Sequence, residues 1–151
     1  MKLYKLNNNI RHIGLVIKNV NKSLYFWCEL LGFKIISDQI ESGSSLSKIL
    51  KIKKVKVRTI KIQDKNKNML ELLYFFNTKK NKFGRSLNLK TNHFGFTHLA
   101  LTVNQIDNLC KLLEKNKIKL NSKPILSKDK KVKMTYIKSP EGVFVELVQI
   151  I

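Results

Sequence analysis

The chain has 151 residues, of which 43% are apolar, so it is long and apolar enough to fold around a core of its own. No apolar run reaches the length of a membrane span and the N-terminus has no apolar signal segment, so we expect neither a membrane partner nor secretion. The formal net charge of +20 comes almost entirely from lysine. Readers of nucleic acid rely on arginine and stacking aromatics, so this charge favours compositional bias, or steering of an anionic substrate, over nucleic acid.

The first half of the chain predicts a strand, a helix and three further strands. The strand at 12–17 is short, apolar and rich in β-forming residues. A helix follows, which Asn19 or Asn21 caps and Gly32 ends. One face of this helix carries Val20, Leu24, Trp27 and Leu31. The other expected elements are strands at 33–38, 55–63 and 69–75, and a short inserted helix within 41–54 that begins near Ser44 or Ser45.

The second half repeats this order. Residues 96–113 align with 10–27 without gaps, and the alignment places His98 on His12. A helix capped by Asn104 carries Ile106, Leu109, Cys110 and Leu113 on one face. Strands are expected at 98–103, 117–120, 132–138 and 144–150. We therefore expect a single domain of residues 1–151, with module 1 at 10–77, a basic linker at 78–95 that contains His93, and module 2 at 96–151.

Each module also begins with a histidine strand and ends with a glutamate strand. Glu71 lies within "NMLELLYFF", and Glu146 occupies the matching place in "FVELVQI". A buried, unpaired carboxylate costs several kcal/mol, so each glutamate needs either water or a positive partner. Alone, any one of these residues is most simply structural. Their repetition at matching points favours a shared role.

Small residues stand beside both histidines. Side chains alternate between the faces of a strand, so His12 shares its face with Gly14, and His98 shares its face with Ala100. This spacing leaves room beside each imidazole. Two curved four-stranded units placed side by side would bring two imidazoles and two carboxylates together, a ligand set that suits a divalent metal with open positions.

Three segments resemble one known family. They are "HIGLVIKNVNKSLYFWCELLGFKI", "THLALTVNQIDNLCKLLEKNKIKL" and "SPEGVFVELVQ", the last with Ser139 where aspartate is commoner. From Ile10 to Gln149 the chain resembles the vicinal oxygen chelate superfamily, also called the glyoxalase/bleomycin resistance/extradiol dioxygenase fold. The resemblance implies an α+β fold in which two tandem βαβββ modules form a curved mixed β-sheet cleft with helices on the outside.

Carried over by position, the resemblance implies a metal site. Its ligands would be His12, Glu71, His98 and Glu146, around one divalent ion (Zn, Ni, Co, Mn, Fe or Mg). In similar proteins the metal chelates two adjacent oxygens of the substrate and stabilises enediolate charge. In the glyoxalase I-like branch a ligand glutamate also carries the proton. By analogy Glu146 is the first choice for this catalytic role and Glu71 the second.

The function implied is a metal-dependent lyase or isomerase of the glyoxalase type, acting on a small, anionic substrate with vicinal oxygens. One alternative is a protein of the same fold that sequesters a toxin or antibiotic. Another is an enzyme similar to methylmalonyl-CoA epimerase, although its third-strand carboxylate base has no counterpart in "VKVRTIKIQ"; Glu41 lies in a nearby loop. A homodimer is expected from the resemblance. Cys28 and Cys110 are expected to be free thiols, which fits a reducing cytoplasm.

Overall fold

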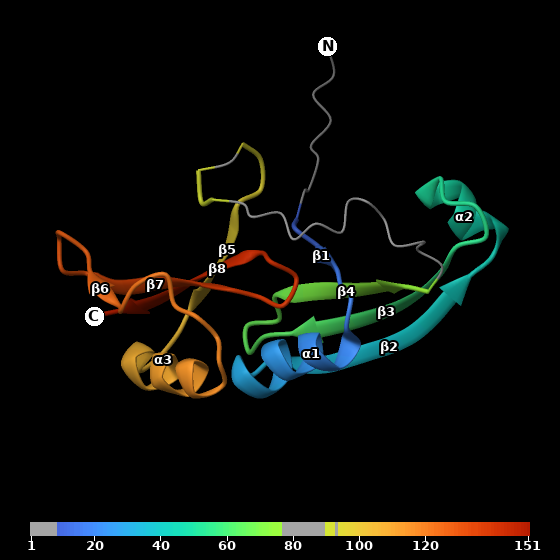
Figure 1. The fold of residues 1–151 in the computed structure, drawn as a ribbon. Helices are drawn as coiled ribbons and strands as arrows, with labels where there is room; N and C mark the ends of the chain where they lie inside the picture. Colours follow the sequence, from blue (N-terminus) through green and yellow to red (C-terminus); the bar gives the residue numbers. More distant parts are fainter. Residues whose placement is uncertain (1–8, 77–89, 93) are drawn as a thin grey trace, which may run out of the picture. The chain divides into compact units, whose positions relative to one another are not determined.

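The computed structural model describes residues 9–76, 90–92 and 94–151, so most of the expected linker, including His93, lies outside the described residues. The described residues form two four-stranded mixed sheets with few helices (Figure 1). Along the chain, each module has the order strand, helix, strand, strand, strand, and the first module has one inserted helix. The expected α+β fold of two βαβββ modules is confirmed.

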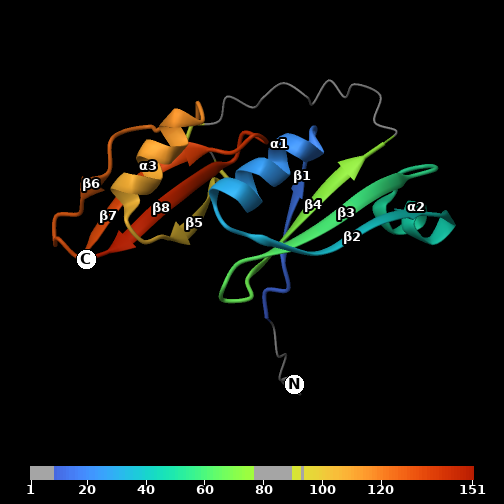
Figure 2. The same cartoon turned by 90° about the horizontal axis from the view of Figure 1, so that it is seen from below.

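In the first sheet, the first and last strands of the module are neighbours. The strand order is β1-β4-β3-β2; β1 and β4 run parallel, and the other pairs are antiparallel (Figure 2). The parallel pair places the beginning and the end of the module side by side. The bounds are β1 Ile13–Val16, β2 Lys34–Ser42, β3 Lys56–Gln63 and β4 Met69–Phe75.

The second sheet repeats this topology with the order β5-β8-β7-β6 and a parallel β5–β8 pair. Its bounds are β5 His98–Thr102, β6 Ile125–Leu126, β7 Val132–Lys138 and β8 Phe144–Ile150. One expected strand is wrong. Residues 117–120 form no strand, because Leu120 alone makes a bridge to Ile137, and the two residues of β6 pair with β7 instead.

The first helix begins and ends where the sequence indicates, but its buried face differs. Asn19 Oδ1 accepts a hydrogen bond from Lys22 N at 3.0 Å, and Gly32 has a φ of 76°. After α1 (Val20–Leu24) the chain continues as the π-helical turn η1 (Tyr25–Leu30). A π-helix has more residues per turn, so the apolar stripe shifts. The buried residues are Ser23, Phe26, Trp27 and Leu30.

The third helix, α3 (Ile106–Lys115), buries Ile106, Cys110 and Leu113 as expected, but not through the expected cap. Gln105, not Asn104, is the N-cap residue, with a φ of 52°, and its side chain makes no capping bond. Gln149 Oε1 of β8 accepts a hydrogen bond from Ile106 N at 2.7 Å instead. A side chain distant in the sequence therefore satisfies this helix end, which local sequence cannot reveal.

By its contacts the chain divides into two compact units, which differ from the two modules. One unit holds residues 9–17 and 32–76; the other holds 18–31 and the described residues from 90 onward. Within the second unit, the Glu141 carboxylate accepts hydrogen bonds from Ser23 Oγ and from Trp27 Nε1, the latter at 3.4 Å. The first helix of the chain is thus held by residues of the second module. The expectation of one domain stays a prediction.

The strands that end the modules alternate between a buried face and a half-exposed face. On β4, Leu70 is 3% and Leu72 0% exposed, whereas Glu71 lies on the opposite face. On β8, Val145 and Leu147 are both 0% exposed, and Glu146 again lies on the opposite face. The alternation keeps both glutamates out of the apolar core.

Among the described residues, we find no helix with the length and apolarity that a bilayer crossing requires.

Candidate metal centre

The first sheet brings His12 and Glu71 together. His12 directly precedes β1, and Glu71 lies in the middle of β4. The parallel register places Gly14 opposite Glu71, so His12 reaches the carboxylate from the same face. His12 Nε2 lies 3.3 Å from Glu71 Oε2.

The second sheet repeats this arrangement. His98 is the first residue of β5, and Ala100 is paired with Glu146 of β8. The distance from His98 Nε2 to Glu146 Oε2 is 3.4 Å. Both glutamate side chains are 16% exposed, so each carboxylate is largely removed from water and faces an imidazole. A partner of this kind is what the sequence requires of a glutamate within an apolar run.

The two pairs have different neighbours, which the sequence analysis missed. Lys61 of β3 lies opposite Glu71, with Lys61 Nζ 3.9 Å from Glu71 Oε1. Tyr136 of β7 occupies the corresponding place opposite Glu146. Each lies ten residues before its glutamate in an antiparallel pair, so strand register could have identified both.

Tyr136 contacts both members of the second pair. Its ring packs edge-to-face against His98, with ring centroids 5.5 Å apart. Burial raises the pKa of the Tyr136 hydroxyl, and the charge of Glu146 and a hydrogen bond with it raise that pKa further. The phenol therefore stays protonated at neutral pH and offers a hydroxyl to the carboxylate.

The second ring nitrogens of the two histidines also differ. Thr97 Oγ1 lies 2.8 Å from His98 Nδ1 and fixes the orientation of that ring. His12 Nδ1 is buried and has no hydrogen-bond partner among the described residues. Metal-binding histidines usually hold their second nitrogen with an oxygen partner, an arrangement that Thr97 supplies to His98.

The pairs have the donor types and spacing that a divalent ion uses. Two ligand atoms bound about 2.1 Å from one ion lie about 3.0–3.4 Å apart, close to the distances between imidazole nitrogen and carboxylate oxygen in both pairs. In each unit, the described residues bring two such ligands together and no group of three or more. That His12, Glu71, His98 and Glu146 share one ion stays a prediction.

Other polar residues of the first sheet are committed to contacts of their own. Arg58 of β3 makes two hydrogen bonds to Asp38 of β2, at 2.8 and 2.6 Å. Thr59 Oγ1 donates a hydrogen bond to Glu41 Oε2. Glu41 lies within β2, opposite Val57, so the expectation that it lies in a loop is wrong. Thr59 and Lys61 share a face of β3, because side chains alternate along a strand. Since Glu41 accepts the hydrogen bond of Thr59, it lies beside that face.

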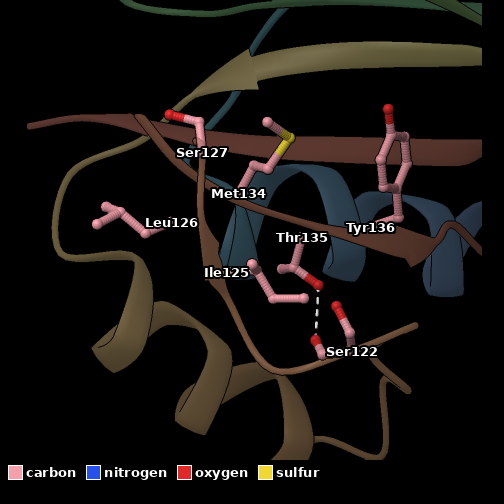
Figure 3. A pocket seen from close by; sticks show the side chains of 7 residues that line it. All are labelled: Ser122, Ile125, Leu126, Ser127, Met134, Thr135 and Tyr136. Carbon is pink, nitrogen blue, oxygen red and sulfur yellow. Dashed lines mark hydrogen bonds between the residues drawn. The ribbon is translucent and has the colours of Figure 1, made fainter. Parts of the chain in front are cut away.

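A pocket of about 290 Å³ opens within the second unit (Figure 3). Apolar side chains from β6 and β7 form much of its wall, and Tyr136 lies at one end. Thr135 Oγ1 donates a hydrogen bond to Ser122 O at 2.7 Å, which ties β7 to the segment that closes the pocket. The lining residues are Ser122, Ile125, Leu126, Ser127, Met134, Thr135 and Tyr136.

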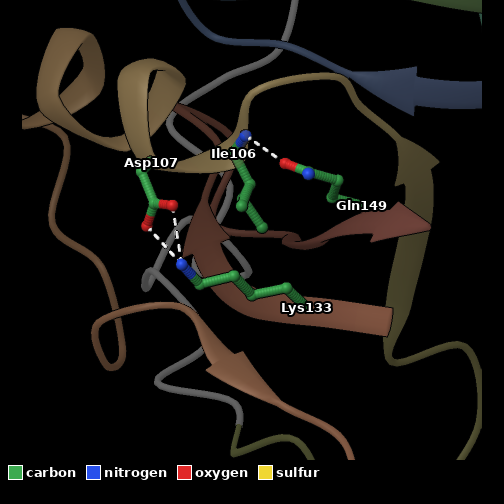
Figure 4. A network of polar contacts seen from close by, with 4 residues as sticks. All are labelled: Ile106, Asp107, Lys133 and Gln149. Atoms are coloured by element: carbon green, nitrogen blue, oxygen red, sulfur yellow. Dashed lines mark hydrogen bonds and ion pairs between the residues drawn. The ribbon is translucent and has the colours of Figure 1, made fainter. Parts of the chain in front are cut away.

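A polar network fixes the strand that carries Glu146 (Figure 4). Lys133 Nζ of β7 lies 2.8 and 2.6 Å from the two carboxylate oxygens of Asp107, at the start of α3. Gln149 of β8 caps the same helix through Ile106 N. Two neighbouring strands thus hold the start of α3. Gln149, which makes one of these contacts, lies three residues after Glu146 on β8.

The fold and the paired histidines and glutamates define a class of protein. The family model "Glyoxalase/Bleomycin resistance protein/Dioxygenase superfamily" matches residues 9–147, and the chain belongs to this superfamily. It is 30% identical over 151 residues to a lactoylglutathione lyase of Schizosaccharomyces pombe, covering 98% of this chain and 48% of that protein. It is also 26% identical to a lactoylglutathione lyase of Pseudomonas putida, covering 91% of this chain and 83% of that protein. The chain therefore spans about half the length of the first relative.

Solved structures agree on the fold. A glyoxalase family protein from Bacillus cereus has a TM-score of 0.84 at 17% identity, covering 100% of this chain and 99% of that one. TnmS3, an antibiotic binding protein from Streptomyces, has a TM-score of 0.62 at 16% identity, covering 95% and 97%. At these identities the likeness shows a common architecture and leaves the reaction open.

Proposed function

We propose that this protein is a metal-dependent lyase or isomerase of the glyoxalase type. The observation that carries the proposal is the repeated pair, an imidazole nitrogen 3.3 or 3.4 Å from a half-buried carboxylate in each sheet. The resemblance to two lactoylglutathione lyases supports a glyoxalase-like reaction. The substrate would be a small anionic compound with oxygens on adjacent carbons, such as a thiohemiacetal, a thioester or a 2-oxo or 2-hydroxy compound.

The residues that would hold the divalent ion are His12, Glu71, His98 and Glu146. A bound divalent ion supplies Lewis acidity and positive charge where the substrate develops negative charge. The protein's own contribution is to orient the ligands. The parallel strand pairs fix each glutamate beside its histidine, and Thr97 fixes the ring of His98.

We assign the movement of a proton between adjacent carbons to Glu146, with Glu71 as second choice. Glu71 lies between the imidazole of His12 and the ammonium group of Lys61, which favours a fixed carboxylate. Glu146 lies between His98 and the neutral phenol of Tyr136, which carries no net charge to hold the carboxylate in place. A less tightly held carboxylate is the better candidate to swing toward the substrate.

The test starts with elemental analysis of protein purified without chelator or affinity metal. We expect about one divalent ion per four-ligand centre. Turnover should be lost when a chelator removes the ion and should return when the same metal is added back. Turnover is measured with methylglyoxal plus glutathione and with methylmalonyl-CoA. The variant His12→Ala, combined with His98→Ala, should no longer gain thermal stability from added metal. Metal-independent turnover, or full metal binding by the double variant, would contradict the proposal.

A second candidate function is sequestration of a small toxin or antibiotic. The apolar-walled pocket of about 290 Å³ favours it. A sequestering protein should bind its ligand stoichiometrically, protect cells in proportion to its amount and show no turnover.

The epimerase-like alternative requires a second base, for which Glu41 is the available carboxylate. Glu41→Gln should then abolish epimerisation of methylmalonyl-CoA without affecting metal content.

A further inference from the structure

Helix α2 and the turn after it carry apolar side chains that the fold leaves exposed. None of the residues of α2 (Ser44–Leu50) is buried. Ile49 is 75%, Leu50 40% and Ile52 44% exposed. The segment stands between β2 and β3 at the end of their hairpin (Figure 1). Exposed aliphatic side chains gathered in one short segment make that segment a candidate contact surface.

The segment is held in place by its own hydrogen bonds. Ser47 Oγ donates to Gly43 O at 2.8 Å and accepts from Val55 N at 3.2 Å, which joins the helix to the chain just before β3. Ile52 N donates to Ser47 O at 3.1 Å and closes the helix end. Val55 is 3% exposed and anchors the segment in the core. The apolar side chains are therefore presented by a fixed scaffold.

Exposed lysines flank these aliphatic side chains along the chain. The exposed lysines of the segment are Lys48, Lys51, Lys53, Lys54 and Lys56. Between Glu41 and Asp64 the sequence contains no acidic residue. A surface with this charge repels a second copy of itself and attracts an anionic partner.

The side chains also restrict the type of anionic partner. Residues 43–57 contain no aromatic residue and no arginine, and Arg58 is held by Asp38. Nucleic-acid surfaces rely on those residue types for stacking and for bidentate contacts. Aliphatic side chains flanked by lysines suit a lipid surface, because the aliphatic groups enter the boundary of the acyl chains while the ammonium groups meet anionic headgroups.

We propose that residues 44–56, the α2 patch, bind an anionic lipid surface peripherally. The partner is a bilayer with phosphate-bearing acidic headgroups, and the contact is independent of the metal centre. The expectation of no membrane partner rests on the absence of a span-length apolar run, which does not bear on a peripheral contact. The proposal therefore revises that expectation for surface binding alone.

The first experiment measures co-sedimentation with vesicles of phosphatidylcholine alone and with vesicles that contain one third phosphatidylglycerol. We expect binding to the acidic vesicles only, weakened by salt. Replacing Lys48, Lys51, Lys53 and Lys54 together by Gln should weaken binding by at least about tenfold. The matched control replaces four exposed lysines elsewhere by Gln, which removes the same charge: Lys111, Lys115, Lys117 and Lys119. Equal loss in both variants would mean that bulk charge alone binds, and would overturn the proposal.

The second experiment tests insertion of the aliphatic side chains. Ile49→Ser with Ile52→Ser keeps every charge and should still weaken binding about tenfold. Tryptophan at Ile49 (I49W) should shift its emission to the blue on acidic vesicles. Tryptophan at Leu112 of α3 (L112W), a residue that is 43% exposed, should not shift. Unchanged vesicle binding of the serine variant would refute a lipid contact. Binding of the protein to duplex DNA, with no emission shift of I49W on acidic vesicles, would refute it as well.

Discussion

Glu71 and Glu146 occupy equivalent positions in the two sheets, but their surroundings differ in charge. Lys61 lies opposite the first and Tyr136 opposite the second. An ammonium group 3.9 Å away attracts the Glu71 carboxylate by its charge, whereas the neutral phenol of Tyr136 holds Glu146 through a hydrogen bond alone. The duplicated modules thus provide two similar ligands with different freedom to move. This asymmetry is the basis for assigning them different roles.

A pair of matched substitutions tests this assignment. Glu146→Gln should lower kcat by at least about 100-fold, because the variant loses the group that carries the proton. Glu71→Gln should lower kcat less, since its role is to hold the ion. Elemental analysis of both variants separates loss of metal from loss of chemistry. Glu114→Gln, an exposed carboxylate of α3, serves as control. A larger kcat loss in Glu71→Gln at equal metal content would reverse the two roles.

At the scale of the elements, the hairpin of β2 and β3 is joined by a pair of oppositely charged side chains. Arg58 Nη2 lies 2.6 Å from Asp38 Oδ2 on adjacent strands. The hydrogen bond to Arg58 is the main cause that lowers the pKa of the Asp38 carboxyl below its usual value. The Arg58 and Asp38 side chains are 35% and 33% exposed, so solvent screens much of their attraction.

This pair predicts a pH-dependent contribution to stability. Because the folded-state pKa of Asp38 is lowered, its contribution is present at neutral pH and is lost as pH falls through that pKa, below about 4. Asp38→Asn should therefore lower the free energy of unfolding by about 0.5 kcal/mol at pH 7. In urea unfolding the difference from the parent protein should be smaller at pH 3 than at pH 7. An equal difference at both pH values would show that the charge of Asp38 contributes nothing.

The sequence was informative about elements where a local signal carries them. Strands with Glu71 and Glu146, and the helix between Asn19 and Gly32, follow from alternation and capping. The prediction from sequence failed where a residue distant in the chain caps a helix, because Gln149 caps α3 in place of Asn104. The π-helical turn likewise moved the buried face of the first helix, because its wider turn breaks the 3.6-residue repeat.

At the scale of the whole molecule, each compact unit holds one histidine–glutamate pair, so a four-ligand centre needs two pairs. They can come from one chain or from two chains of the expected homodimer. The sequence predicts the four ligands as one set, and the local pairs arise because the first and last strands of each module are neighbours. Neither strand register nor side-chain spacing within a unit specifies which second pair completes the centre.

Mixing two inactive variants decides between these arrangements. If two chains of a dimer share each centre, a mixed dimer of one His12→Ala chain and one His98→Ala chain holds one intact centre and one doubly altered centre. Activity should then recover to about one quarter of the parent value, because half the dimers are mixed and half their centres are intact. Separately refolded variants provide the control. No recovery, in a sample that contains mixed dimers, would assign both pairs to a single chain.

The parallel pairing of β1 with β4, and of β5 with β8, has a consequence for how the protein matures. His12 and Glu71 stand at opposite ends of a module, as do His98 and Glu146, so a nascent module has no complete pair until its last strand emerges and docks. Capture of the ion would thus report that the last strand of each module has docked. Premature termination before β8 would leave a protein whose second pair never forms.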